Sequence, residues 1–534
     1  MNALINATKL IKVAGAFGSA AAFSSVGMGQ TDTWFIPLTE SAPVTDPNSY
    51  EELAMPWVTP AGVNQTNLMS MREVEDAVLS PGQSVVRVDA GNVSSMFDMI
   101  AYDDSGEFLF IPHETPWGAG VSRFDIMTRE NHVIFQGDGA GIGGDWSNDY
   151  AAFDPCRFTP NKTLFLGEEW SGEGRIIEVL NPFSAPADIE YRELNSIANV
   201  AHEGINFSEK YPRVIYYIDE WRSGSIYKFV MRRPGDYSRG QTFVLRADAF
   251  LSSGGSPEDN YNEQADGVER FGMATWVPIT DRRGNPLTAV SPFRNGPTND
   301  PRSNDDTRGG RVAADEVGGT PYGRPEDMEV SRNRRGNEVL YIAITSENAV
   351  LSVEILSSRK AKVGLLASGD TPNNVGFAPT TGVLNSPDNL AQDALGNIYI
   401  IEDAPNGSDT GGDIWFARDT NDDGVAESLD HFMSIRADGS EATGMIFNPV
   451  NPTEYVVAVQ HPDSTNLANV PDGLGDAVWK FDLSYIDNQR FVRALKRGKR
   501  DRGHGNDDTT MMIDVIGVAT ATMIRPNLGF FRLI

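Results

Sequence analysis

Short apolar strands recur along this chain in units of three, and the unit occurs six times. Each unit begins with an acidic residue on an apolar strand, passes through a turn to a second strand ending in polar or acidic residues, and closes with a third strand. The later strands are rich in β-branched and aromatic residues, which are typical of strands. The second strands are expected at 107–113, 163–168, 213–218, 338–344, 397–401 and 454–459, and the third strands at 120–126, 174–180, 224–230, 349–355, 412–417 and 476–482.

Neighbouring units begin about 50–60 residues apart, a period typical of propeller blades. One insertion, at about 231–320, separates the third unit from the fourth and is dense in Gly, Asp, Arg and Pro. The pattern predicts an all-β fold, a six-bladed β-propeller over residues 91–485 with a long insertion between blades 3 and 4. We expect the insertion to form a cap or wall near the channel mouth, and residues 30–90 to be a lead-in.

The two ends of the chain differ from the repeats. Lys9 and Lys12 precede a run of small and apolar residues at 13–28, which predicts an export signal over residues 1–29 and a secreted or periplasmic protein. Residues 486–534 form a basic run followed by an apolar tail. No other stretch is long and apolar enough to span a membrane, so integral membrane association is not expected. Cys156 is the single cysteine, which excludes an intrachain disulfide. We expect a monomer.

The formal net charge of −30, from 74 acidic and 44 basic residues, narrows the possible ligands. Nucleic-acid binding is not expected, because it requires a basic surface that replaces counterions. An acidic protein also repels phosphate-bearing substrates, so phosphate chemistry would require a bound metal or a placed arginine.

Acidic residues occupy the same register on the first strands of five units. The sixth unit has Thr443 there, with Glu441 two residues earlier. The innermost strands of a propeller line one central channel, so side chains in one register lie at a common height around its axis. The register predicts one layer made of Asp98, Asp149, Glu203, Glu326 and Asp388.

The second strands supply further acids where they end, so the channel is expected to carry a ring of carboxylates. Such a ring is a site for hard cations, because calcium takes six to eight oxygen ligands and crowded carboxylates need cations to neutralise them. The alternative is that acids at strand ends face water. The further acids are Glu114 and the pairs Glu168–Glu169, Asp219–Glu220 and Glu402–Asp403.

A second calcium site is predicted in the loop that begins at Asp419. Asp419, Asn421 and Asp423 precede a glycine in the spacing of a calcium-binding loop, Glu427 stands at the ninth position and Asp430 at the twelfth. The loop lies between expected strands, so we interpret it as structural. The alternative is an ordinary Asp/Asn/Gly turn.

The motifs of other hydrolases are missing: there is no Gly-x-Ser-x-Gly, no His-Glu-x-x-His and no P-loop. Arg324 is the candidate for binding substrate, since it stands two residues before Glu326. Pro325 should hold Arg324 extended. A forked cation beside a metal cluster suits a phosphoryl group, although it would also balance neighbouring acids.

Several short motifs resemble those of the PhoX-type alkaline phosphatases over about residues 95–465. They are His113-Glu114 followed by Gly120-Val121-Ser122-Arg123, Glu168-Glu169, His202-Glu203-Gly204, Ser225-Ile226-Tyr227-Lys228-Phe229, Arg324-Pro325-Glu326, Pro387-Asp388-Asn389 and Gln460-His461-Pro462. The resemblance implies a six-bladed propeller, export, phosphomonoesterase activity and an axial cluster of calcium and ferric ions. It also implies that Arg324 contacts the substrate phosphate and that the metal ligands include Glu168, Glu169, Glu203, Asp219 and Glu326.

One position departs from the family pattern. Gly167 stands where the family has a cysteine that binds iron. Without a thiolate the cluster would have oxygen ligands only, which favours Ca²⁺ over Fe³⁺.

These observations together predict metal-assisted hydrolysis of small-molecule phosphate esters. The metal ligands are predicted to be Glu114, Glu168, Glu169, Glu203, Asp219, Glu326 and Asp388, with Arg324 as the catalytic residue. Two alternatives remain open: a calcium-dependent lactonase or arylesterase, which would not need Arg324, and a non-catalytic calcium-stabilised binding protein, which Gly167 favours.

Overall fold

The computed structural model describes residues 34–44, 54–77, 97–170, 173–294, 309–373, 383–403, 410–461, 476–486 and 488–502. The predicted export signal and the apolar tail after residue 502 lie outside these ranges. Among the described residues, no helix has both the length and the apolarity to cross a membrane.

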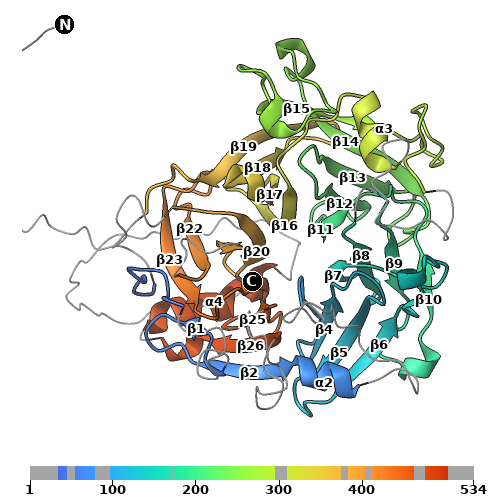
Figure 1. Ribbon diagram of the computed structural model, residues 1–534. Helices are drawn as coiled ribbons and strands as arrows, with labels where there is room; N and C mark the ends of the chain where they lie inside the picture. Colours follow the sequence, from blue (N-terminus) through green and yellow to red (C-terminus); the bar gives the residue numbers. More distant parts are fainter. Residues whose placement is uncertain are drawn as a thin grey trace, which may run out of the picture.

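Antiparallel sheets arranged around a common centre make up the described chain, so the fold is all-β and propeller-like (Figure 1). The first sheet contains β3 (Ala101–Tyr102), β4 (Phe108–His113), β5 (Gly120–Asp125) and β6 (Asn131–Gln136). The second contains β7 (Phe153–Phe158), β8 (Leu164–Glu168), β9 (Ile176–Val179) and β10 (Tyr191–Glu193).

The third sheet has nine strands, where two separate blades were expected. Its two halves are β11 (His202–Phe207), β12 (Val214–Asp219), β13 (Ile226–Met231) and β14 (Gly240–Ala247), and β16 (Pro325–Arg332), β17 (Glu338–Ile344), β18 (Ala349–Ile355) and β19 (Lys360–Ser368). They are joined because β15 (Gly272–Pro278) pairs with both β14 and β19. The predicted insertion therefore supplies β14 and β15 to this sheet, together with helix α3 (Gly310–Glu316).

Each of the last two sheets includes one strand from the N-terminal lead-in. One contains β1 (Trp57–Val58), β20 (Pro387–Gln392), β21 (Ile398–Glu402), β22 (Asp413–Arg418) and β23 (Ser428–Ile435). The other contains β2 (Gln65–Ser70), β24 (Glu441–Phe447), β25 (Glu454–Gln460) and β26 (Ala477–Asp482). Because β2 pairs with β26, a segment near the start of the chain completes the final sheet.

Helices are few and short in the described chain. Besides α3, they are α2 (Met71–Asp76), α4 (Gln489–Arg502) and the 3-10 turns Ala140–Gly143, Pro186–Asp188, Leu251–Ser253, Tyr261–Glu263, Thr345–Glu347 and Leu483–Tyr485. The basic run near the C-terminus is helical, and its Leu495 is fully buried. Trp34 stacks on Phe491 of the same helix, with ring centroids 4.0 Å apart.

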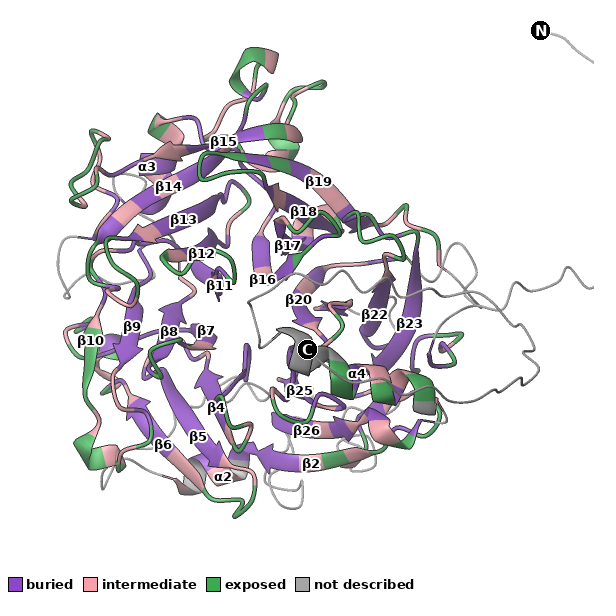
Figure 2. Ribbon diagram, turned by 180° about the vertical axis from the view of Figure 1, so that it is seen from behind, coloured by how far each residue is buried: buried purple, intermediate pink, exposed green. Residues whose placement is uncertain are grey.

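Apolar side chains fill the spaces between neighbouring sheets. Figure 2 shows that buried residues dominate the strands, whereas exposed residues collect on the outer turns. One buried cluster joins Phe165 of β8 to Tyr217 of β12, and another joins Leu390 of β20 to Tyr341 of β17. Packing of this kind holds adjacent sheets at a fixed angle and so positions the innermost strands around the channel.

Candidate metal centre

Five innermost strands, β7, β11, β16, β20 and β24, share a pairing irregularity at the same place. In each, a paired residue is followed by two residues outside the ladder before pairing resumes: Phe153 to Cys156, His202 to Ile205, Pro325 to Met328, Pro387 to Leu390 and Thr443 to Ile446. A β-bulge of this kind re-aims side chains, and bulges are common next to functional sites. In the same order of strands, the first of the two unpaired residues is Asp154, Glu203, Glu326, Asp388 and Gly444.

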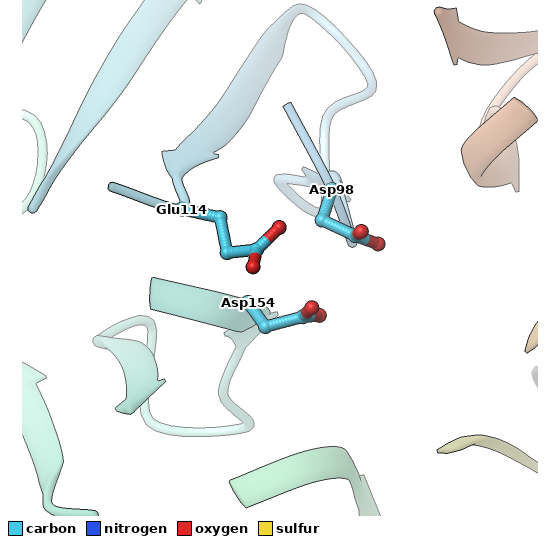
Figure 3. A group of neighbouring side chains, drawn as sticks. All are labelled: Asp98, Glu114 and Asp154. Carbon is cyan, nitrogen blue, oxygen red and sulfur yellow. The ribbon is translucent and has the colours of Figure 1, made fainter. Parts of the chain in front are cut away.

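The four carboxylates from these bulges line a cavity of about 300 Å³ among the innermost strands. Asp98, which precedes β3, and Glu114, which follows β4, line it as well. Figure 3 shows Asp98, Glu114 and Asp154 as neighbours that extend from three separate segments. The remaining lining residues are Glu169, Arg324, Asp403, Glu441, Gln460 and His461.

Three groups of carboxylates in this cavity are close enough to share a cation, with one oxygen from each residue within 4.8 Å of the others. The groups are linked, because Asp154 belongs to the first and second and Glu203 to the second and third. They are Asp98–Glu114–Asp154, Asp154–Glu169–Glu203 and Glu203–Glu326–Asp388.

Several oxygens in these groups are buried, and no residue that the structure describes forms a hydrogen bond with them. They include Asp98 Oδ1, Asp154 Oδ1 and Glu203 Oε2. A buried oxygen without a partner loses its water and gains nothing in return, so it is costly unless a cation binds it. The unpartnered oxygens and the all-oxygen donor set therefore fit a hard divalent cation.

Crowding and burial oppose ionisation of these carboxylates when no cation is bound. Burial and the charges of Asp154 and Glu169 raise the pKa of Glu203 well above its ordinary value. Burial and the charge of Glu441 raise the pKa of Glu114 to about 8 and that of Asp403 to about 7. The metal-free cavity therefore holds protons that a bound cation would displace.

The metal-free protein is expected to lose stability as the pH rises. Glu114 and Asp403 have pKa values of about 8 and about 7 in the folded chain, against roughly 4 in an unfolded one. The folded state then binds more protons than the unfolded state, so the free energy of unfolding falls between about pH 4 and pH 8. Thermal melts of chelated protein should show a midpoint lower by at least about 5 °C at pH 8 than at pH 5. Saturating calcium should flatten this profile, and a midpoint that rises with pH in the chelated protein would contradict the assignment.

The structure brings five of the seven predicted ligands together: Glu114, Glu169, Glu203, Glu326 and Asp388. The other two, Glu168 and Asp219, lie outside the cavity. Glu168 forms a buried ion pair with Arg175, with two contacts of 2.6 Å, and Asp219 accepts two bonds of 2.8 and 2.7 Å from Arg311. Their oxygens also accept backbone N–H groups of Ala151 and Ala201.

The acidic pairs at the ends of the second strands thus divide their roles. The first acid is buried and holds the strand end in place: Glu402, for example, accepts a bond of 2.8 Å from the Trp415 ring nitrogen. The second acid faces the axis, as Glu169 and Asp403 do. Successive strand residues point to opposite faces, so adjacent acids cannot both line the channel.

Asp149 was expected in the axial layer, but it accepts backbone hydrogen bonds from Gly118, Gly141 and Tyr150 and so holds a loop. Asp154, which the register of acids did not predict, takes its place. A usable signal was present: Asp154 precedes Glu168 by the same number of residues as Asp388 precedes Glu402. Alignment on the second strand, whose register is unbroken, would have found Asp154.

Glu168 and Glu169 offer a test that separates anchoring from ligation. Glu168→Gln should destabilise the fold by about 3–5 kcal/mol, because it leaves the guanidinium of Arg175 buried and unpaired. Urea unfolding would measure this. The neighbouring Glu169→Gln removes a carboxylate whose pKa is raised by burial and by Glu220, so the stability of the metal-free protein should be kept or increased. Equal losses of unfolding free energy in the two variants would contradict the assignment of Glu168 as an anchor and Glu169 as a ligand.

Arg324 lies at the cavity edge, but not in the extended conformation predicted for a residue before proline. Its φ is +55°, in the left-handed region. Backbone bonds hold it there: its N–H donates to Trp221 at 3.0 Å, and its carbonyl accepts from Thr345 at 3.1 Å. Strain of this sort persists only where surrounding contacts enforce it, and it is common at functional sites.

The Arg324 side chain bridges acids of two strands and remains 35% exposed. Its Nε contacts Glu220, and its Nη2 lies 3.2 Å from Glu326. Burial opposes the charge of Arg324, but these two carboxylates outweigh that effect and raise its pKa. The guanidinium is therefore a fixed cation at the rim, with N–H donors in a planar fork that suits phosphate oxygens.

A second cation stands on the same wall. Burial alone would lower the pKa of His461, but a hydrogen bond of 2.8 Å to Glu441 and the charge of that residue raise it to about 10. Gln460 beside it donates to Glu114 at 2.8 Å and to Asp98 at 3.3 Å. Both residues belong to the family-like motif and line the cavity.

Gly167 and Cys156 both lie outside the cavity. A Cβ on Gly167 would lie 2.6 Å from Pro155 Cγ and 2.9 Å from His202 Cβ, so a side chain there would require neighbouring atoms to move. Cys156 is buried on β7, and burial raises the pKa of its thiol. The cavity wall among the described residues therefore offers oxygen ligands and no thiolate.

The predicted calcium loop lies between β22 and β23, and its acids bond within the loop. Asp419 accepts backbone N–H groups of Asp423 at 3.1 Å and Gly424 at 2.7 Å. Asn421 donates to Glu427 at 2.9 Å. These are contacts of an ordinary Asp-rich turn.

Asp430, expected as the twelfth-position ligand, does not join that loop. It lies on β23 with its carboxylate 2.5 Å from Arg418 of β22. The loop leads directly into a strand whose register directs Asp430 toward the neighbouring strand, whereas the helix of a calcium-sensor loop would turn it back toward the ion.

Comparison with known proteins identifies a family. The family model described as alkaline phosphatase PhoX matches residues 114–463, which is more than half of the chain. No curated protein sequence matches the chain.

Solved structures share a coarse likeness. A gluconolactonase from Xanthomonas campestris is 10% identical, with a TM-score of 0.35 and coverage of 84% of this chain and 98% of the other. The calcium-binding protein regucalcin from Agrobacterium tumefaciens is 9% identical, with a TM-score of 0.31 and coverage of 74% and 92%. An auxiliary nutrient binding protein from Bacteroides thetaiotaomicron is 7% identical, with a TM-score of 0.39 and coverage of 78% and 76%.

Proposed function

The chain belongs to the PhoX alkaline phosphatase family, and we propose that it is an exported, calcium-dependent phosphatase that hydrolyses small-molecule phosphomonoesters in the axial cavity. The observation that carries this proposal is the set of three linked carboxylate groups beside Arg324. Carboxylates alone would repel a phosphate ester, whereas carboxylates neutralised by cations and flanked by an arginine would attract one.

Calcium is the proposed metal because the donor set contains only oxygen. The residues that would hold it are Asp98, Glu114, Asp154, Glu169, Glu203, Glu326 and Asp388. A bound divalent cation supplies Lewis-acid polarisation of phosphoryl oxygens and lowers the pKa of bound water. Because no cysteine lines the described cavity, its ligands favour calcium over iron.

The chain's own residues have distinct roles in this proposal. Arg324 binds and orients the phosphoryl group, and its charge opposes the negative charge that builds up in the transition state. His461 is held protonated by Glu441 and adds a second positive charge on the wall. Gln460 fixes the orientation of Glu114 and Asp98 through its amide.

The nine-stranded sheet is proposed to represent two blades joined at their outer edges, which would make six in all. Its two halves, β11–β14 and β16–β19, each have four strands in sequential order, and β15 only bridges them. Each half also has the inner-strand bulge that carries an axial carboxylate. We also propose that the protein is a monomer.

Activity and metal content should be measured on the same purified protein. We expect p-nitrophenyl phosphate to be hydrolysed, activity to disappear after chelation and return with added calcium, and elemental analysis to find calcium. Hydrolysis of phenyl acetate without hydrolysis of the phosphate ester would replace the proposal with an esterase, and bound calcium without either activity would make the cluster structural.

A further inference from the structure

A large basic cavity lies at the outer part of the nine-stranded sheet, away from the axis. Its volume is about 840 Å³, and five of its fourteen lining residues are arginines while none is acidic. In a chain with a net charge of −30, such a concentration of positive charge is unusual. The arginines come from five segments of sequence: Arg213, Arg232, Arg246, Arg282 and Arg359.

None of these arginines forms an ion pair with a carboxylate of the described chain. Among the described residues, no carboxylate lies within 4 Å of any of the five guanidinium groups. Arg246 donates to the Val317 carbonyl at 2.8 Å, and the nearby carboxylate of Asp248 is paired with Lys360 at 2.7 Å. Like charges that share one concave surface repel one another unless an anion binds between them.

A buried lysine stands behind the same wall. Lys228 is only 3% exposed, and its ammonium donates to the Ser358 carbonyl at 2.8 Å. It also lies 4.4 Å from the ring centroid of Trp276 and 5.0 Å from that of Phe243. Burial, with no counter-charge to offset it, lowers the pKa of Lys228 to about 7.

Lys228 lines a smaller cavity of about 210 Å³ that adjoins the basic one, since Arg213, Val230 and Ser358 line both. A buried ammonium without a carboxylate is costly. Lys228 thus lies beside the wall of Arg213, Val230 and Ser358 that the two cavities share, and an anion bound there would favour its charged form.

The remaining wall is mostly apolar and aromatic, with Gln241, Thr275 and Ser358 as its polar residues. Phe243 on β14 and Trp276 and Val277 on β15 contribute to it, together with Met231 at the end of β13. A ligand that suits this cavity therefore has anionic oxygens for the arginines and a ring or short apolar part for the aromatic wall. Arginine forks match phosphate oxygens two at a time, and the volume is that of a typical small-molecule site.

We propose that this cavity is an accessory binding site for a phosphate-bearing organic anion. It shares no residue with the axial cavity. Its strands form the outer part of the sheet in Figure 1, whereas the axial carboxylates come from the innermost strands. The proposal does not rest on the phosphatase activity and would stand if that activity were absent.

The test uses a ligand that a phosphatase cannot hydrolyse and a pair of matched double variants. Adenosine 5′-(α,β-methylene)diphosphate would be titrated calorimetrically into wild-type protein, R232Q/R282Q and R233Q/R283Q. Arg233 and Arg283 are exposed and adjacent to the tested arginines, but they do not line the cavity. Both double variants change the net charge equally.

We expect R232Q/R282Q to bind the probe at least about tenfold more weakly than wild type, because two charge-assisted contacts are lost. R233Q/R283Q should bind within about twofold of wild type, because screening weakens charges that do not touch the ligand. R324A, which would weaken binding of the probe in the axial cavity alone, should retain the binding that R232Q/R282Q loses. The hydrolysis of p-nitrophenyl phosphate by both double variants should equal that of wild type.

The phosphate group that this site binds could belong to a soluble ester or to a lipid headgroup, and a vesicle assay distinguishes the two. Sedimentation with phosphatidylglycerol vesicles, compared with phosphatidylcholine vesicles, would reveal recognition of a lipid headgroup. If wild type binds vesicles but not the free probe, and R232Q/R282Q loses the vesicle binding, the site recognises a lipid headgroup. If wild type binds only the free probe, the site recognises a soluble ester. Equal weakening in both double variants, loss in R324A only, or no binding of probe or vesicles by wild type would overturn the proposal.

Discussion

Replacing Glu203 with glutamine is expected to lower metal affinity by on the order of 10²-fold or more, since even residues that only support ligands cost 10–100-fold when changed. Phosphatase activity should fall with the bound metal. Glu203 belongs to two of the three linked carboxylate groups, and it is only 2% exposed with one oxygen unpartnered. The amide has nearly the same shape but no charge, so it should leave the fold intact while weakening two adjacent sites.

Metal content by elemental analysis and the rate of p-nitrophenyl phosphate hydrolysis should be measured on the same preparation. Glu454→Gln is the matched control, because Glu454 lies at the start of β25 outside the cavity and only approaches Lys480 at 3.9 Å. It should retain metal and activity. A Glu203→Gln protein with full calcium and full activity would remove the linked groups from the proposed function.

Replacing Arg324 with alanine is expected to reduce kcat by about 10²–10³-fold, comparable to the loss of one oxyanion-hole donor. Arg324→Lys should recover part of this loss, because lysine keeps the charge but not the planar fork that holds two phosphate oxygens. Steady-state kinetics would measure both variants. The side chain is 35% exposed, so neither change should prevent folding.

Metal content must be followed in the same experiment, because Arg324 also contacts Glu220 and Glu326. We expect metal to be retained, with the loss confined to turnover. Arg335→Ala serves as the control, since that side chain is 76% exposed and only 3.7 Å from Glu354. Unchanged kcat in Arg324→Ala would exclude Arg324 from the mechanism, and lost metal would assign it a supporting role for the ligands.

The repeat in the sequence was sufficient to predict strands, their order and a layer of acids around a channel. Glu203, Glu326 and Asp388 could be placed from one register because each follows the first residue of its strand, inside the same bulge. The acidic pairs at strand ends were also recognisable. Both signals are local, since they depend on alternation along a strand and on where a strand ends.

Which member of each acidic pair faces the axis was decided by tertiary structure. Asp219 points away from the axis because it pairs with Arg311, which is buried beside it and lies 92 residues later in the chain. Glu168 points away from the axis because it pairs with the buried Arg175. A shift of one residue sends a strand side chain to the opposite face. Residue types alone therefore cannot distinguish a ligand from the anchor next to it.

The sequence by itself determined the all-β repeat, the excess of acids and four carboxylates of the axial layer, Asp98, Glu203, Glu326 and Asp388, because these follow from local patterns. The tertiary structure decided that Asp154 replaces Asp149, that Arg324 adopts a left-handed conformation, and that β15 joins two sheet halves around a basic cavity. Those outcomes depend on hydrogen bonds and strand pairing between distant segments. Only the first left a local signal in the chain, the spacing between Asp154 and Glu168.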